Sequence, residues 1–132
     1  MQQFSLKTER RTQLVQITEQ VQEALGETDG ASAALVYVPH TTAGVTINEH
    51  IDPELLVDLE GALEKIVSDE WKWRHKDADG PNGPSHARAS LISPQVLVPL
   101  RDGELALGTY QGIFFCEFDG PRDRKIYVTL LH

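Results

Sequence analysis

The chain of 132 residues contains a single cysteine, so no disulfide can form within it. Its longest apolar run, residues 31–38, is far shorter than the roughly 20 residues that a membrane-spanning helix needs. The first residues, MQQFSLKTERR, lack the basic start and apolar stretch of a secretory signal. These absences predict a cytoplasmic protein that has no disulfide and does not act in a membrane.

The chain also lacks any long run of lysine or arginine. Twelve basic residues against twenty acidic residues give a formal net charge of −8. Because nucleic-acid binding requires a basic surface, this composition argues against a nucleic-acid partner. A phosphate-bearing ligand would need a local basic pocket. Residues 71–90 hold four of the twelve basic side chains, together with two tryptophans and two histidines.

Length and patterning predict one domain, residues 1–132, of the α+β class. Asp52 followed by Pro53 indicates a helix start, and apolar spacing predicts that this helix runs to about Val67. Its predicted buried stripe is Leu55, Leu56, Leu59, Ala62, Leu63, Ile66 and Val67. Thr18 and Ser85 are the expected N-caps of two shorter helices, and residues 71–84 form a long loop. Extended segments are expected at residues 3–8, 11–15, 31–39, 45–50, 95–100, 104–118 and 125–131, the last three as an antiparallel meander.

Three of the five histidines lie at predicted structural boundaries. His40 follows a buried strand, His75 lies in the long loop, and His86 falls in the first turn of a helix. Three imidazoles with a position open to water are typical of a catalytic zinc site, although these spacings match no local metal signature. They could equally be unrelated loop histidines. Asp77 and Asp79 could orient His75 or be solvated charges, His50 is expected on a solvated strand face, and His132 at a frayed end.

Other polar residues have two interpretations each. Strand alternation places Glu49 with Val45 and Ile47 on the core-facing side, where a carboxylate belongs either to an ion pair or to a site. The first helical turn after Ser85, with Arg88 and with Ser90 on the face of His86, could bind an anion or could be a plain capped helix. The segment GTYQG, residues 108–112, indicates a bend or bulge, and its Thr109 and Gln111 could bind a ligand or a neighbouring strand. Cys116 is expected to be buried and inert.

Several motifs occur together in order: HTTAGVTINE, a following DP, PSHARAS and GTYQGIFFCEFDGPR. With them the chain resembles the YjbQ family, labelled a secondary thiamine-phosphate synthase family, over residues 30–130. Tyr110 stands where tryptophan is usual in that family. The resemblance implies an antiparallel β-sandwich-like sheet core with two or three short-to-medium helices, assembled as a homotrimer with pockets near the subunit boundaries. It also implies a metal or anion beside His40, His75 and His86.

The resemblance favours an enzyme that joins hydroxymethylpyrimidine diphosphate to thiazole phosphate and releases pyrophosphate. In this hypothesis His40, His75 and His86 bind a divalent metal, zinc first, with magnesium as an alternative for a diphosphate substrate. Glu49, His40 and His86 are the expected catalytic residues. The alternatives are a non-catalytic trimeric module that binds a small phosphorylated metabolite, or purely structural histidines. The expected phosphate-binding residues are Thr41, Thr42, Asn48, Arg88, Ser90, Thr109 and Gln111.

Overall fold

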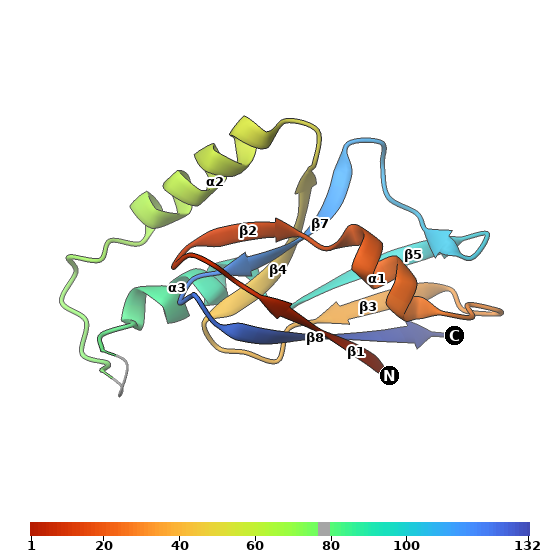
Figure 1. The fold of residues 1–132 in the computed structure, drawn as a ribbon, viewed down its shortest axis with the longest axis horizontal. Helices are drawn as coiled ribbons and strands as arrows, with labels where there is room; N and C mark the ends of the chain where they lie inside the picture. The colour runs from red at the N-terminus through yellow and green to blue at the C-terminus, as the bar shows by residue number, and fades with distance from the viewer. Residues whose placement is uncertain (77–79) are drawn as a thin grey trace.

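The computed structural model describes residues 1–76 and 80–132. Within these residues three helices accompany eight strands arranged in two antiparallel sheets (Figure 1). The helices are α1 (Thr18–Leu25), α2 (Pro53–Ile66) and α3 (Gly83–Ile92). The strands are β1 (Gln2–Lys7), β2 (Gln13–Gln16), β3 (Ala33–Tyr37), β4 (Ala43–Glu49), β5 (Gln95–Arg101), β6 (Glu104–Leu105), β7 (Gln111–Glu117) and β8 (Asp123–Leu131).

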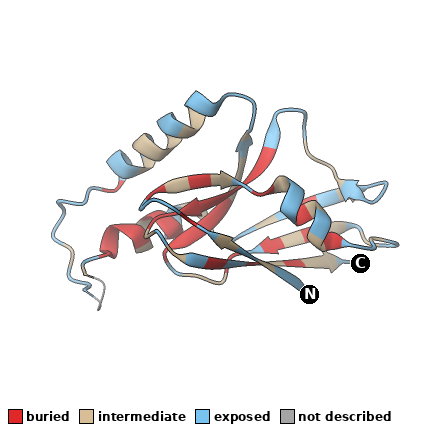
Figure 2. Ribbon diagram, in the orientation of Figure 1, coloured by how far each residue is buried: buried red, intermediate tan, exposed pale blue. Residues whose placement is uncertain are grey.

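The two sheets enclose the main core. One sheet has the strand order β1-β8-β3-β5-β6 and the other β2-β7-β4. Alternate residues of their strands point inward and are fully buried, among them Val36, Val45, Phe115 and Ile126. Helix α1 adds Val21 to this core, whose buried positions run through the middle of the molecule in Figure 2. The predicted α+β class, with a sandwich-like antiparallel core, is confirmed.

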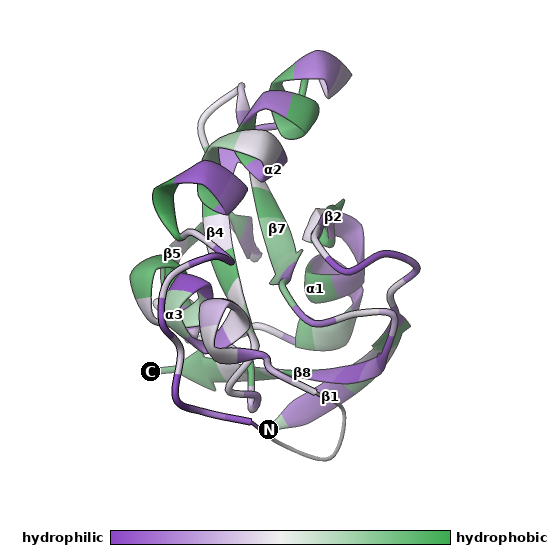
Figure 3. Ribbon diagram, turned by 90° about the vertical axis from the view of Figure 1, so that its left-hand side faces the viewer, coloured by the Kyte–Doolittle hydropathy of each residue, from purple (hydrophilic) through white to green (hydrophobic). Residues whose placement is uncertain are grey.

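A second, smaller core lies on the outer face of the three-stranded sheet, under α2 and α3 (Figure 3). It is built around Phe114, Cys116 and Phe118, which are the residues of β7 and its end that alternate with the inner set. Helix α2 contributes three leucines of its predicted stripe, all of them only partly buried, and no residue of α2 is fully buried. Val57 and Ile66 are each 68% exposed. The prediction that Ile66 lies in a buried stripe is therefore wrong for this single chain.

Of the three predicted N-cap residues, one caps its helix in the structure and two do not. Asp52 caps α2, because its carboxylate accepts a hydrogen bond from the amide of Glu54 (3.0 Å), as predicted. Thr18 is instead the first residue of α1, where its hydroxyl accepts a hydrogen bond from the amide of Ile113 (2.9 Å). Helix α3 begins earlier than expected, at Gly83, so Ser85 is not its N-cap. The Ser85 side chain is buried and donates to the carbonyl of Phe118.

The expected long extended run over residues 104–118 is interrupted. Strand β6 covers only Glu104–Leu105 and β7 starts at Gln111, so residues 108–110 of GTYQG lie in the connection between two strands, and Gln111 and Gly112 begin β7. No helix within residues 1–76 and 80–132 has both the length and the apolar character that crossing a bilayer requires.

Candidate functional site

A polar cavity of about 360 Å³ lies where the loop after β3 meets the start of α3 and the turn between β7 and β8. We call it the histidine cavity, because His40 and His86 both line it. Two smaller cavities adjoin it through His86, one of about 340 Å³ that also includes His40, and one of about 290 Å³ that includes His75. The full lining of the histidine cavity is Pro39, His40, Thr41, Thr42, Asn82, His86, Asp119, Arg122 and Arg124.

A buried ion pair supports one wall of the cavity. Arg124, on the inward face of β8, donates to the carboxylate of Glu117 at the end of β7 through Nε (2.8 Å) and through Nη2. Thr8 Oγ1 (2.7 Å) and the amide of Asp119 (2.9 Å) also donate to Glu117. Burial alone would raise the pKa of Glu117, but Arg124 and these donors hold that pKa below its ordinary value. Arg124 Nη2 then reaches Thr42, donating to its hydroxyl oxygen (2.8 Å).

A second ion pair lies beside the first. Arg122 donates to the carboxylate of Asp119 through Nη2 (2.7 Å) and to the carbonyl of Asp119 through Nε (2.9 Å). Asn82, at the start of α3, donates its amide to the same Asp119 carboxylate (3.1 Å). The turn between β7 and β8 is thereby tied to α3, and the cavity gains two guanidinium groups in a chain whose net charge is −8.

His40 is held by the backbone of β8. Its Nε2 accepts a hydrogen bond from the amide of Lys125 (2.9 Å). Burial, followed by the positive charge of Arg124, lowers the pKa of His40 below its ordinary value. Thr41 is exposed at the rim of the cavity, whereas Thr42 is buried and already accepts from Arg124.

His75 and His86 contact each other from separate segments. Their ring centroids are 4.9 Å apart and the rings meet edge to face at 89°. Trp73 anchors the segment before α3, because its ring packs on Gly83 and its Nε1 donates to the carbonyl of Ser68 (2.9 Å). Trp71 is 69% exposed and touches the edge of Trp73. The structure thus brings the three predicted histidines together: His75 contacts His86, and His40 lines the same cavities as His86. Asp77 and Asp79 lie outside the described residues.

The hydrogen bond between His40 and Lys125 bears on the three-histidine zinc site that the resemblance implies. In the described part of the chain, no three His, Cys, Asp or Glu side chains are arranged to hold a metal ion. The Nε2 of His40 is already used as a hydrogen-bond acceptor. The remaining nitrogen of a neutral imidazole then carries the hydrogen, so neither nitrogen of His40 has a lone pair free for a metal.

Arg88 is not in the histidine cavity. Its guanidinium is fully buried and bonds to the C-terminal end of α2, with its shortest bond to the carbonyl of Val67 (2.7 Å). It also contacts the carbonyls of Leu63 and Glu64 and the carboxylate of Asp69. Its expected role as a phosphate ligand is corrected to that of a cap on α2. Ser90 lines the two adjoining cavities and donates to the carbonyl of His86 (3.0 Å).

The other predicted residues lie at the far end of the β4–β7 pair. Ala43, at one end of β4, lines a cavity beside His40, and Glu49 ends the strand. Six residue steps at about 3.3 Å separate the two by roughly 20 Å. Glu49 is half-buried and pairs in register with Gln111, and Asn48 is exposed beside it. Thr109 is exposed and its carbonyl contacts the ring of His50 (3.1 Å). Glu49 therefore does not share a site with His40 and His86, and the geometry does not assign these four residues to the histidine cavity.

The charged residues that line the cavity, Asp119, Arg122 and Arg124, are not among those singled out from the sequence. One signal was available. Arg124 alternates with Ile126 and Val128, which predicts that it points inward, and Glu117 ends the apolar run IFFC. An inward arginine and an inward glutamate predict a buried ion pair, since either charge alone would be costly.

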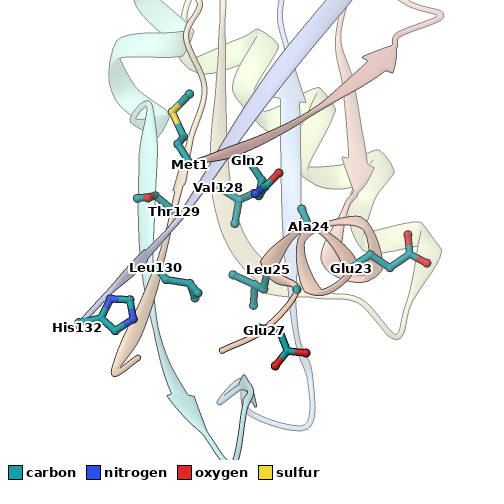
Figure 4. Close-up of a pocket in the computed structure, with 11 residues that line it drawn as sticks. Met1, Gln2, Glu23, Ala24, Leu25, Glu27, Val128, Thr129, Leu130 and His132 are labelled. Atoms are coloured by element: carbon teal, nitrogen blue, oxygen red, sulfur yellow. The ribbon is translucent and has the colours of Figure 1, made fainter. Parts of the chain in front are cut away.

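A larger cavity of about 620 Å³ lies elsewhere, between α1 and the ends of β1 and β8 (Figure 4). Its walls combine polar groups with apolar side chains, and among the latter Leu25 and Leu130 face the space. Glu23 points away from these side chains and His132 lies at the opposite edge. Two arginines and two histidines converge in the histidine cavity, whereas the charged residues of the larger cavity are Glu23 and Glu27, so we take the histidine cavity as the candidate site.

The fold and the cavity define a small two-sheet α+β domain with a polar site built from strand ends. Residues 2–132 match the model of a family described as UPF0047 protein YjbQ-like. The chain belongs to this YjbQ (UPF0047) family.

Relatives and solved structures agree over nearly the whole chain. A UPF0047 protein of Methanocaldococcus jannaschii is 40% identical over 131 residues, covering 97% of this chain and 91% of the relative. UPF0047 protein YugU of Bacillus subtilis is 39% identical over 132 residues, covering 97% and 96%. The crystal structure of a YjbQ/UPF0047-family protein from Clostridium acetobutylicum has a TM-score of 0.88 at 40% identity and covers 98% of both chains. A hypothetical protein from Aeropyrum pernix K1 has a TM-score of 0.88 at 36% identity, covering 98% and 96%.

Proposed function

We propose that the histidine cavity binds the phosphate or diphosphate group of a small metabolite, and that the chain is a transferase of the thiamine-phosphate synthase type. One observation carries this proposal. His40, His86, Arg122 and Arg124 line a single cavity in a chain that is otherwise strongly acidic. A volume of about 360 Å³ lies within the range of small-molecule sites. The hydrogen-bond donors there suit the oxygens of a phosphate group.

The proposed reaction needs anion stabilisation more than proton transfer. The thiazole nitrogen uses its lone pair to form a bond to the methylene carbon of hydroxymethylpyrimidine diphosphate. The bond from that carbon to the diphosphate oxygen breaks, and pyrophosphate leaves with the electron pair. No proton is removed, so no general base is required. The position of Glu49 at the far end of β4 is compatible with this chemistry, and donors aimed at the departing charge are the main requirement.

No step is assigned to a resident metal. A magnesium ion bound to the diphosphate would supply further neutralisation of its charge. Among the described residues that line the cavity, the one carboxylate is that of Asp119, which Arg122 and Asn82 engage. Arg122, Arg124 and the two imidazoles are therefore the groups that hold the anion in this proposal.

The experiment is a coupled binding and product assay with the untagged protein. Pyrophosphate binding is measured by calorimetry, and thiamine phosphate formed from the two substrates is measured by mass spectrometry. Arg122→Gln should weaken pyrophosphate binding about tenfold, as expected for a lost charge-assisted hydrogen bond. Arg101→Gln removes the same charge at the exposed end of β5 and is the matched control, with unchanged affinity.

The two readouts separate the candidate functions. Product formation that is lost in His86→Asn, with the melting temperature preserved, supports the transferase. Pyrophosphate binding without product supports the non-catalytic module for a phosphorylated metabolite. If wild type and Arg101→Gln bind no pyrophosphate under any divalent-ion condition, the proposal is wrong in both forms.

We also propose that the chain assembles as a homotrimer. Helix α2 carries an apolar pattern but has no fully buried residue, and Val57 and Ile66 are each 68% exposed. Leu91, within α3, is 62% exposed, and Trp71, in the segment between α2 and α3, is 69% exposed. Exposed apolar side chains in such numbers are typical of surfaces that another chain covers. Light scattering on the eluting protein should give three times the chain mass of 14.7 kDa, and a mass of one chain would contradict the assembly.

A further inference from the structure

The bond from the Lys125 amide to His40 determines where the imidazole carries its hydrogen. A backbone N–H can only donate, so Nε2, at 2.9 Å, must accept and holds no hydrogen. The ring is therefore neutral and its hydrogen lies on Nδ1. This assignment does not depend on any ligand, because both partners of the bond belong to the chain.

The sheet explains why this amide needs a side chain as its partner. Strands β3 and β8 pair with Tyr37 opposite Tyr127, and the same register would place Pro39 opposite Lys125. Lys125 pairs in register with Ser5 of β1 on one side, but on the other side the ladder to β3 stops at Tyr37, so the Lys125 amide has no partner in β3. His40 supplies the missing acceptor through its ring and so continues the ladder by one bond. The end of the β3–β8 ladder thus fixes the orientation of the imidazole.

The opposite nitrogen of the ring is available to a ligand. His40 Nδ1 has no hydrogen-bond partner within residues 1–76 and 80–132. His40 as a whole is only partly buried, and its Nδ1 is not among the fully buried atoms without a partner. His40 lines the histidine cavity, where Arg124 lies behind it, bonded to Glu117 and Thr42.

We propose that His40 is a fixed neutral hydrogen-bond donor, which presents Nδ1–H to an anionic oxygen of the bound ligand and neither ligates a metal nor accepts a proton. The donor role rests on the proposed function, whereas the tautomer does not. Lys125 acts through its amide as the positioning residue. The ligand that fits this donor is an anion with phosphate-like oxygens. Such oxygens accept hydrogen bonds, and the Nδ1–H group of His40 is already held in position to donate one.

The tautomer is tested on the ligand-free protein by NMR of ¹⁵N-labelled histidine. The signals of His40 are assigned as those lost in His40→Gln. We expect a hydrogen-bearing Nδ1 and a bare Nε2 at neutral pH, and we expect both signals to stay in place when Zn²⁺ is added. A hydrogen on Nε2, a doubly protonated ring, or a zinc-dependent shift of His40 Nε2 would overturn the inference.

The donor role is tested with two isosteric variants and pyrophosphate. His40→Gln places an amide oxygen near the Nε2 position, so it keeps an acceptor for Lys125 but removes the donor. His40→Asn places an amide N–H near the Nδ1 position and keeps the donor. Pyrophosphate affinity should fall about tenfold in His40→Gln and stay within about threefold of wild type in His40→Asn.

The outcomes distinguish this inference from the proposed function. If wild type binds pyrophosphate and both variants bind equally well, the donor role is wrong while the proposed function stands. If wild type binds no pyrophosphate, the proposed function and the donor role both fail, and the NMR result still decides the tautomer. Melting temperatures near that of wild type for both variants ensure that lost affinity is not lost folding.

Discussion

The carboxylate of Glu117 and the guanidinium of Arg124 form a buried ion pair that joins the two sheets beside the histidine cavity. Glu117 is 0% exposed and Arg124 is 4% exposed. A buried pair of this kind contributes little net stability compared with apolar residues, but removal of one partner leaves an uncompensated charge. The pair also connects the core to the site, because Arg124 bonds to Thr42 in the cavity wall.

Removal of one partner should therefore destabilise the fold strongly. Arg124→Met is expected to lower the free energy of unfolding by about 3–5 kcal/mol, because Glu117 would keep a buried charge. The double variant Glu117→Gln with Arg124→Met should recover much of this loss. Urea denaturation measures both. A single variant as stable as wild type would mean that water already solvates the pair.

The same pair predicts how stability depends on pH. The pKa of Glu117 is held below its ordinary value in the folded chain, whereas in the unfolded chain it is about 4.3. The stability that Glu117 contributes is thus present above about pH 4.3 and is lost as the pH falls through the lower folded pKa. Unfolding free energies measured from pH 6 to pH 2 should fall less steeply for Glu117→Gln than for wild type. Parallel curves would contradict this account.

Cys116 should be inert in the folded protein. Burial raises the pKa of its thiol to about 12, and the side chain lies in the core under α2 and α3. A thiol reagent at pH 8 should label it only after urea unfolding. Because the unfolded thiol ionises near pH 8.5, the contribution of Cys116 to stability is complete below that pH and declines as the pH rises toward about 12. Rapid labelling of the native protein would show that the smaller core opens.

Substitution of two glycines by alanine should change the stability of the fold in opposite directions. A Cβ at Gly83 would lie 2.6 Å from the Trp73 ring, so Gly83→Ala must displace the anchor of the segment that carries His75. A Cβ at Gly61 would meet nothing within 4 Å, and Gly61→Ala within α2 should stabilise by up to about 1 kcal/mol. Thermal unfolding should show a lower melting temperature for the first variant and a higher one for the second. A neutral Gly83→Ala would contradict the packing of Trp73.

Local features were predictable from the sequence because their partners are near in the chain. The start of α2 depends on Asp52, Pro53 and the amide of Glu54, all within three positions. The alternation in β4 likewise placed Val45 in the core. The α+β class follows from such local patterns taken together.

The site was harder to predict because its contacts are distant in sequence. Thr8 and Glu117 are separated by 109 positions, and His40 and Lys125 by 85. Arg88 was expected at a phosphate because the helix start near it resembles an anion site, yet its guanidinium caps α2. Only the pairing of the strands decides which of these charges meet.

The most direct test of the central claim is a crystal structure of the protein grown with pyrophosphate. The account predicts the anion in the histidine cavity, within hydrogen-bond distance of His40 Nδ1 and of Arg122 or His86. Pyrophosphate bound in the cavity between α1 and β8 instead, with the histidine cavity holding only water at saturating ligand, would contradict it.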